Sequence, residues 1–141
     1  MTSVCPTLIS CSPYDYGKLI RLFPKTSGKK TKAASMLGLH VEGPYFGLAK
    51  IGAHPLQNIK TPRNHPFSEV YGNDLTNVKI VTLAPEVDGS LDLIKELKSK
   101  YPSIVVAIGH SSANLKEAQM SVRAGATKIT HLFNAMRSFH H

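Results

Sequence analysis

Short apolar runs that end at polar residues recur along the chain and predict buried strands. The run at residues 104–108 is nearly continuous, which is typical of a parallel strand buried on both faces. The first run is interrupted by Pro6, which places that residue near a strand start or at an irregular point. Strands are expected over residues 4–9, 36–42, 78–83, 104–108 and 128–130.

Helical patterns separate these strands. Helices are expected over residues 12–23, 66–72, 90–100 and in a stretch that ends at 124. Ser12 is the expected N-cap of the first helix, Asn64 or His65 of the second, and Ser112 or Asn114 of the last. The long connection at residues 43–63 has no clear periodicity, which in a compact domain indicates a functional loop.

Strands that alternate with helices predict an α/β fold with a parallel sheet and right-handed crossovers. An open doubly wound sheet is the alternative, but no glycine-rich dinucleotide fingerprint follows the first strand. Polar motifs at the carboxyl ends of several strands favour a barrel, where those ends form one mouth. A (β/α)8 TIM-type barrel needs about 250 residues. The sequence therefore predicts a partial barrel of about five strands, as one incomplete domain over residues 1–141.

The composition is that of a soluble globular protein, with 42% hydrophobic and 18% charged residues. No apolar run approaches the roughly 18 residues of a membrane span, and the first residues lack a secretory signal pattern. Cys5 and Cys11 suit neither a disulfide framework nor a CxxC metal site, so reduced thiols are expected. Together these features predict a cytoplasmic protein without a membrane partner.

The net charge of +8 is concentrated in part at residues 25–32, where four lysines lie among small polar residues. A solvated loop explains this segment. No interleaved aromatic residues or zinc-finger spacing indicate nucleic-acid binding, so no nucleic-acid partner is expected. A basic module that binds nucleic acid or acidic surfaces remains the alternative from another functional class.

Glu42, His110 and His131 each stand at the end of a predicted strand. Imidazole nitrogen and carboxylate oxygen hold zinc, iron and similar ions, and three such ligands leave one coordination position open. Each residue also has an ordinary structural interpretation: His110 as a helix cap, Glu42 as the partner of a lysine, His131 as a buried imidazole. Their joint placement at strand ends favours a catalytic divalent metal.

Several blocks of sequence together resemble one known family. In order they are LGLHVEGP (37–44), GAHP (52–55), TLAPE (82–86), GHS (109–111) and THLFNAM (130–136). This pattern is similar to the N-acetylglucosamine-6-phosphate deacetylases of the amidohydrolase superfamily, and it extends over nearly the whole chain. The resemblance implies hydrolysis of N-acetylglucosamine 6-phosphate to glucosamine 6-phosphate and acetate in amino-sugar catabolism.

The resemblance also implies roles for individual residues. Glu42, His110 and His131 would bind one divalent metal, Zn²⁺ or Fe²⁺, whose bound water attacks the acetamide carbonyl. His54 would lie beside the acetamide and help to bind or polarise its oxygen. In the family a later strand, outside this chain, carries the aspartate that serves as general base. The chain alone is therefore expected to be an inactive fragment, and the full-length protein a homodimer.

Asn134 and Ala135 match family residues that contact the sugar phosphate, and backbone N–H groups in such a turn can bind an anion. His140 and His141 are expected to be exposed. Glu86 is expected to act as a carboxylate at a helix entry, and Ser111 to make capping or supporting hydrogen bonds.

Three alternatives remain open. The chain could be a catalytically inactive truncated product that only binds metal. It could be the basic binding module centred on residues 25–32. It could also be another amidohydrolase with a different substrate, because fold and metal ligands alone do not determine the substrate.

Overall fold

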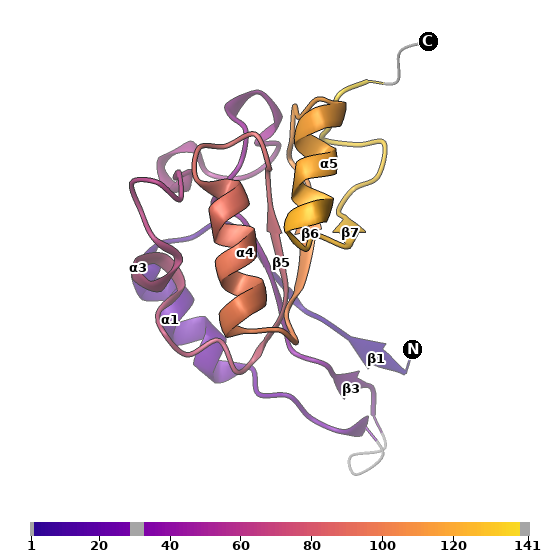
Figure 1. Cartoon of the computed structure of the whole chain (residues 1–141). Coiled ribbons are helices and arrows are strands. Elements are labelled where there is room, and N and C mark those ends of the chain that lie inside the picture. Colours follow the sequence, from indigo (N-terminus) through magenta and orange to yellow (C-terminus); the bar gives the residue numbers. More distant parts are fainter. Residues whose placement is uncertain (1, 29–32, 139–141) are drawn as a thin grey trace.

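The computed structural model describes residues 2–28 and 33–138. Its main element is a five-stranded sheet in the order β2-β4-β5-β6-β7, in which every neighbouring pair is parallel. The strands are β2 (Thr7–Leu8), β4 (Leu39–Glu42), β5 (Val78–Leu83), β6 (Val105–Ile108) and β7 (Lys128–Ile129). This sheet, with helices between consecutive strands, confirms the predicted partial barrel of about five strands (Figure 1).

A second, two-stranded sheet pairs β1 (Ser3–Val4) with β3 (Ser35–Met36) below the main sheet (Figure 1). The single strands predicted over residues 4–9 and 36–42 are therefore each divided in two, and that prediction was wrong. Pro6 has no N–H to donate, and Gly38 has a φ of +125°, so neither chain segment continues as regular strand.

The helices are α1 (Pro13–Leu22), α3 (Phe67–Tyr71), α4 (Ser90–Lys100) and α5 (Leu115–Ala124), with 3₁₀ turns at Leu48–Lys50 and Leu56–Asn58. Ser12 caps α1 as predicted, and Asn114 forms a capping box with Glu117 at α5. The short helix predicted over residues 66–72 is present as α3, but the predicted N-cap, Asn64 or His65, was wrong: the N-cap is Pro66, with no side-chain cap bond. In Figure 1, α4 and α5 lie side by side, while α1 and α3 form a second pair.

Alternate residues of the strands separate a hydrophobic face from a polar face. Leu39 and Val41 of β4 belong to the buried core, which also includes residues of α1, α3 and α4. Because successive side chains of a strand point to opposite faces, His40 and Glu42 lie on the other side of the sheet. Thr82 of β5 lies on that side too, since it contacts His40. The polar face of the sheet thus carries the candidate functional residues.

Three sequence-based expectations concern the remainder of the molecule. Cys5 and Cys11 are both free thiols. Within residues 2–28 and 33–138, no helix is both long and apolar enough to cross a membrane. Most of the lysines at residues 25–32, and His140 and His141, lie outside the described residues.

Candidate active site

Glu42 stands at the carboxyl end of β4. The N–H of the next residue, Gly43, donates to the Thr82 carbonyl oxygen at 3.0 Å and so continues the pairing with β5. Gly43 has a φ of +81°, and a Cβ there would lie 2.5 Å from the ring of Phe46. Only glycine fits this turn, and the turn leaves the Glu42 side chain buried and directed at the histidines.

His110 and His131 both contact one oxygen of Glu42. The distance from Glu42 Oε1 is 2.9 Å to His110 Nε2 and 2.7 Å to His131 Nε2. The histidines follow β6 and β7, and both have left-handed backbone conformations, with φ of 51° and 57°. Such conformations are costly for non-glycine residues and are concentrated at functional sites. The carboxyl ends of β4, β6 and β7, three of the five strands, therefore bring these polar side chains together, as predicted.

A backbone carbonyl determines the tautomer of His110. Its Nδ1 lies 2.8 Å from the Lys50 carbonyl oxygen, which can only accept, so Nδ1 carries a proton. In the neutral ring, Nε2 then directs a lone pair at the Glu42 carboxylate. A proton or a cation is needed between these two acceptors. Metal-ligating histidines commonly donate their second ring N–H to a backbone carbonyl in this way.

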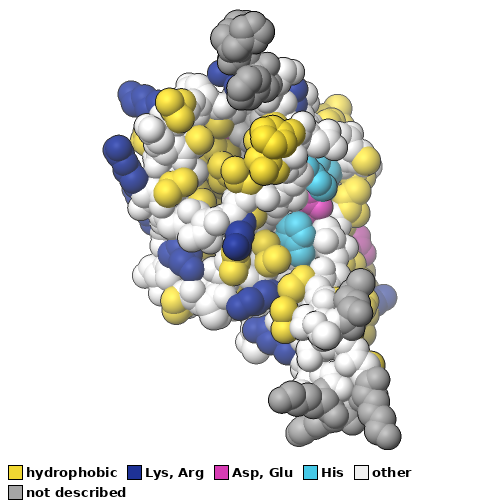
Figure 2. Space-filling view, turned by 90° about the vertical axis from the view of Figure 1, so that its right-hand side faces the viewer, with side chains coloured by type: hydrophobic (Ala, Val, Ile, Leu, Met, Phe, Trp, Pro, Cys, Tyr) yellow, Lys and Arg dark blue, Asp and Glu magenta, His cyan; other side chains and the backbone are white. Residues whose placement is uncertain are grey.

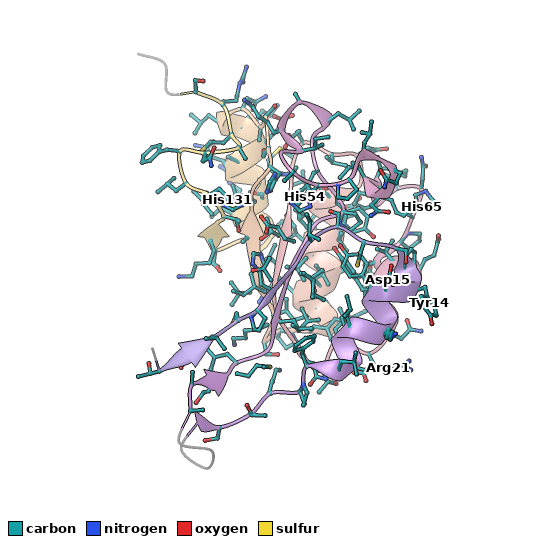
Figure 3. All side chains as sticks on the ribbon, turned by 180° about the vertical axis from the view of Figure 1, so that it is seen from behind. Tyr14, Asp15, Arg21, His54, His65 and His131 are labelled. Carbon is teal, nitrogen blue, oxygen red and sulfur yellow. The ribbon has the colours of Figure 1, made fainter. Side chains whose placement is uncertain are left out.

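His54 approaches from the loop after β4 and has the opposite tautomer. The Ser10 N–H donates to His54 Nδ1 at 3.2 Å, so the neutral ring carries its proton on Nε2. Figure 3 shows His54 and His131 coming from separate parts of the chain towards the same region. The His54 and His110 rings meet edge to face with centroids 4.6 Å apart. Ligand atoms of Glu42, His54 and His110 lie within 4.8 Å of one another, so these residues form a possible metal-binding group.

The charges at this cluster follow from its contacts. The hydrogen bond from His110 lowers the pKa of Glu42 to about 2, although burial opposes this shift. Burial alone would lower the pKa of His110, but its bonds to Glu42 and to the Lys50 carbonyl raise it. Burial, assisted by the charge of His110, lowers the pKa of His54 to about 4, so His54 is neutral near neutral pH. Glu42 is therefore anionic beside a neutral His54.

Glu86 supports the turn that bears His110, which corrects the expectation that it acts at a helix entry. Its carboxylate accepts from the Ser111 hydroxyl at 2.6 Å and from the Ser112 N–H at 2.5 Å. Gly47 passes close by, and a Cβ there would lie 2.6 Å from Glu86 Oε1. The supporting role predicted for Ser111 is present, since its oxygen also accepts from the Ala113 N–H. No local sequence pattern indicates the contact between Glu86 and the serines.

Asn134 and Ala135 lie in the turn after His131. Asn134 is exposed, and its side-chain oxygen accepts from the Ala135 N–H at 2.9 Å. The Ala135 carbonyl accepts from the Ser111 N–H at 3.1 Å, so this turn is joined to the one that carries His110. Their role as sugar-phosphate contacts stays a prediction.

A cleft of about 1190 Å³ adjoins this turn and the start of α5. Its lining includes two basic residues, Lys50 and Arg137, together with Ser112 and Phe133. In Figure 2, two histidines flank an acidic side chain on this face, near exposed hydrophobic groups. The cluster is therefore accessible from the surface next to a partly basic cleft.

Relatives from rat and human match the whole chain. It is 46% identical over 144 residues to N-acetylglucosamine-6-phosphate deacetylase of Rattus norvegicus, and 44% identical to that of Homo sapiens. The match to the Bacillus subtilis enzyme is 39% over 108 residues, or 77% of this chain. No family model matches. The chain spans about a third of these relatives, 34% of the rat and human proteins and 27% of the Bacillus protein.

Solved structures give the same result. N-acetylglucosamine-6-phosphate deacetylase from Thermotoga maritima matches all of this chain with a TM-score of 0.82 and 30% identity, over 37% of its own length. An aspartate-to-alanine mutant of the Mycobacterium smegmatis enzyme, in complex with N-acetyl-D-glucosamine-6-phosphate, matches 96% of this chain with a TM-score of 0.79 and 32% identity. This chain is therefore a homologue of the N-acetylglucosamine-6-phosphate deacetylases, matched along its whole length to about one third of theirs.

Proposed function

We propose that this chain supplies the metal centre of an N-acetylglucosamine-6-phosphate deacetylase, which releases acetate and glucosamine 6-phosphate. The observation that carries the proposal is the convergence of Glu42, His110 and His131 on one point at the strand ends. The relatives at 44–46% identity bear the name of this activity. We further propose that residues 1–141 are one incomplete barrel domain of a cytoplasmic, homodimeric enzyme without nucleic-acid or membrane partners.

The donor set of these three residues fits a divalent cation. The Lys50 carbonyl fixes the proton of His110 on Nδ1, which leaves the Nε2 lone pair directed at the Glu42 carboxylate. His131 offers a second Nε2 to the same oxygen. Two imidazole nitrogens and a carboxylate oxygen suit Zn²⁺ or Fe²⁺. A bound ion of this kind supplies Lewis-acid polarisation of an amide carbonyl.

His54 is proposed as a hydrogen-bond donor to substrate, although its position also makes it a possible metal ligand. The Ser10 N–H occupies Nδ1, so Nε2 carries the proton of the neutral ring. Metal coordination through Nε2 would require the proton to leave that nitrogen, whereas donation of the Nε2 proton to the acetamide oxygen requires no change. The lowered pKa of His54, which results first from burial, keeps the ring neutral for this role.

The phosphate of the substrate is proposed to bind in the cleft beside the turn after His131. Lys50 and Arg137 line this cleft, and both are cations suited to a phosphate. Asn134 and Ala135 are the proposed contacts within the turn. An anion would compete with the Asn134 side chain for the Ala135 N–H.

We propose that the isolated chain does not turn over substrate. Proton transfer in amide hydrolysis needs a general base, worth about 10²–10⁴-fold in rate. Among the described residues, the carboxylates bonded to the site and to its supporting turn are Glu42 and Glu86, and both are engaged. The isolated chain is therefore expected to bind metal without releasing acetate, which is also what an inactive truncated product that only binds metal would do.

A chimera tests the proposal directly. This chain replaces the matching third of the rat relative, and acetate release from N-acetylglucosamine 6-phosphate is measured. We expect an active chimera that loses at least about 100-fold in kcat/KM on His110→Ala, because the variant removes a proposed ligand. A Lys116→Ala chimera, changed on the exposed surface of α5, is the control. A folded chimera without activity, or one insensitive to His110→Ala, would exclude the proposed function.

A further inference from the structure

A series of hydrogen bonds crosses the polar face of the sheet, the face that also carries Glu42. Thr7 Oγ1 lies 3.1 Å from His40 Nδ1, and His40 Nε2 lies 2.6 Å from Thr82 Oγ1. Thr82 Oγ1 in turn lies 2.8 Å from Thr130 Oγ1. These residues come from β2, β4, β5 and the end of β7. One network therefore links both outer strands of the five-stranded sheet.

The last bond passes over β6, because Gly109 leaves room for it. β6 lies between β5 and β7 in the sheet, and Gly109 directly follows β6. A Cβ on Gly109 would lie 3.0 Å from Thr130 Cβ and 3.0 Å from Thr82 Cγ2. A side chain at this position would thus push the two threonines apart. The missing side chain allows strands that are not neighbours to join directly.

The bond between Thr82 and Thr130 lies next to a residue of the candidate site. Thr130 immediately precedes His131, whose φ of 57° is unfavourable for a non-glycine residue. β7 pairs with β6 through two residue pairs, Ala107 with Lys128 and Ile108 with Ile129, and the Thr130 N–H donates to the Ile108 carbonyl at 2.9 Å. His131 is 43% exposed, so packing restrains it little. The hydroxyl of Thr130 is a side-chain anchor for the segment that carries His131.

Thr82 is suited to hold this anchor. It is fully buried, so an unpaired hydroxyl there would be costly, and its two contacts in the network are His40 and Thr130. With one proton and two lone pairs, the Thr82 hydroxyl can donate to at most one of them and accept from the other or from both. His40 stands two residues before Glu42 on the same face of β4. The network therefore joins the strand of Glu42 to the strand of His131.

We propose that Thr130, held by Thr82 and His40 across Gly109, is a positioning residue that places His131 Nε2 against Glu42. The contact between His131 and Glu42 joins two side chains of this chain, so its geometry can be measured separately from metal affinity. The consequence for metal affinity rests on the proposed function.

Three variants of the chain test the positioning role. Thr130→Val removes the hydroxyl at nearly constant shape, Thr130→Ser keeps it, and Thr127→Val is a matched control at an exposed position just before β7. The readouts are the ¹⁵N chemical shift of His131 Nε2 in the metal-free chain and the Co²⁺ dissociation constant from absorption spectra. We expect Thr130→Val to change the His131 shift and to weaken Co²⁺ binding by about 10–100-fold. Thr130→Ser and Thr127→Val should stay within about twofold of the parent chain.

Gly109→Ala is a second route to the same answer if Thr130→Val does not fold. It keeps both hydroxyls but separates them, and it should change the His131 shift in the same direction. An unchanged His131 shift in folded Thr130→Val or Gly109→Ala would overturn the proposal, as would an equal effect of Thr130→Ser. If the parent chain binds no Co²⁺ while Thr130→Val still changes the His131 shift, the proposed function fails and the positioning role stands.

Discussion

A single carboxylate oxygen determines the chemistry available at this site. Glu42 Oε1 faces two imidazole nitrogens, and the tautomer of His110 leaves a lone pair where the carboxylate needs a positive partner. In the metal-free chain a proton on His110 satisfies this need, which is why the pKa of His110 is raised against the effect of burial. A divalent cation would replace that proton. The same contacts therefore account for an ion pair without metal and for a ligand set with it.

Glu42→Gln separates the charge of the carboxylate from its shape. The amide keeps one oxygen but is neutral, so Co²⁺ affinity should fall by at least about 100-fold, more than loss of a supporting hydrogen bond would cause. The measurement is a titration followed by the absorption of bound Co²⁺. Glu69→Gln, an exposed carboxylate paired with His65, is the control and should bind as the parent does. Equal affinities for Glu42→Gln and the parent would show that Co²⁺ binds elsewhere.

The loops at the strand ends are joined by partly buried polar bonds as well as by packing. Glu86, in the connection after β5, accepts from Ser111 and Ser112 in the connection after β6. The Ser111 N–H then donates to the Ala135 carbonyl in the turn after β7. The ends of β5, β6 and β7 are thus connected in order. These bonds help to position the histidines that follow β6 and β7.

Glu86→Gln should destabilise the chain through these connections. The amide is neutral and accepts only through its single oxygen, so the bonds to Ser111 and Ser112 no longer both have a charged acceptor. Bonds to a charged acceptor contribute about 1.5–3 kcal/mol, so the free energy of unfolding should fall by about 1–3 kcal/mol, measured by urea denaturation. Glu96→Gln removes only a surface ion pair with Lys100 and should change stability by less than about 1 kcal/mol. Equal midpoints for both variants would contradict the structural role of Glu86.

The sequence predicted those elements for which local pattern and end signals agree. Val78–Leu83 and Ser90–Lys100 match the predicted bounds, because a continuous apolar run and a helical periodicity each have clear limits. Where one residue breaks a strand, as Gly38 does between β3 and β4, the apolar pattern continues and conceals the break.

The candidate site was predictable to a similar extent. Polar residues at strand ends pointed to Glu42, His110 and His131, because parallel strands bring their carboxyl ends to one edge. The bond between Thr82 and Thr130 was not predictable, since it depends on the register of strands that are 48 residues apart and on the gap at Gly109.

β7 is an edge strand of the described sheet, and the surface beside it is exposed. A groove of about 960 Å³ lies between α5 and β7, and its lining is mainly apolar. Leu115, Val122, Ile129 and Leu132 are each about half or more exposed there. The outer edge of β7 has no neighbour among the described strands. An unpaired strand edge beside an apolar surface favours association with another polypeptide.

The isolated chain should therefore associate with itself in a concentration-dependent manner. Val122→Lys combined with Ile129→Lys places two charges on this apolar groove, which makes its burial against another chain costly, and should shift the chain to monomer. Sedimentation velocity over a range of concentrations measures the change. Leu22→Lys, at a 60% exposed position on α1, adds charge away from the groove and should leave association unchanged. If Leu22→Lys dissociated the chain equally well, net charge rather than the open β7 side would govern association.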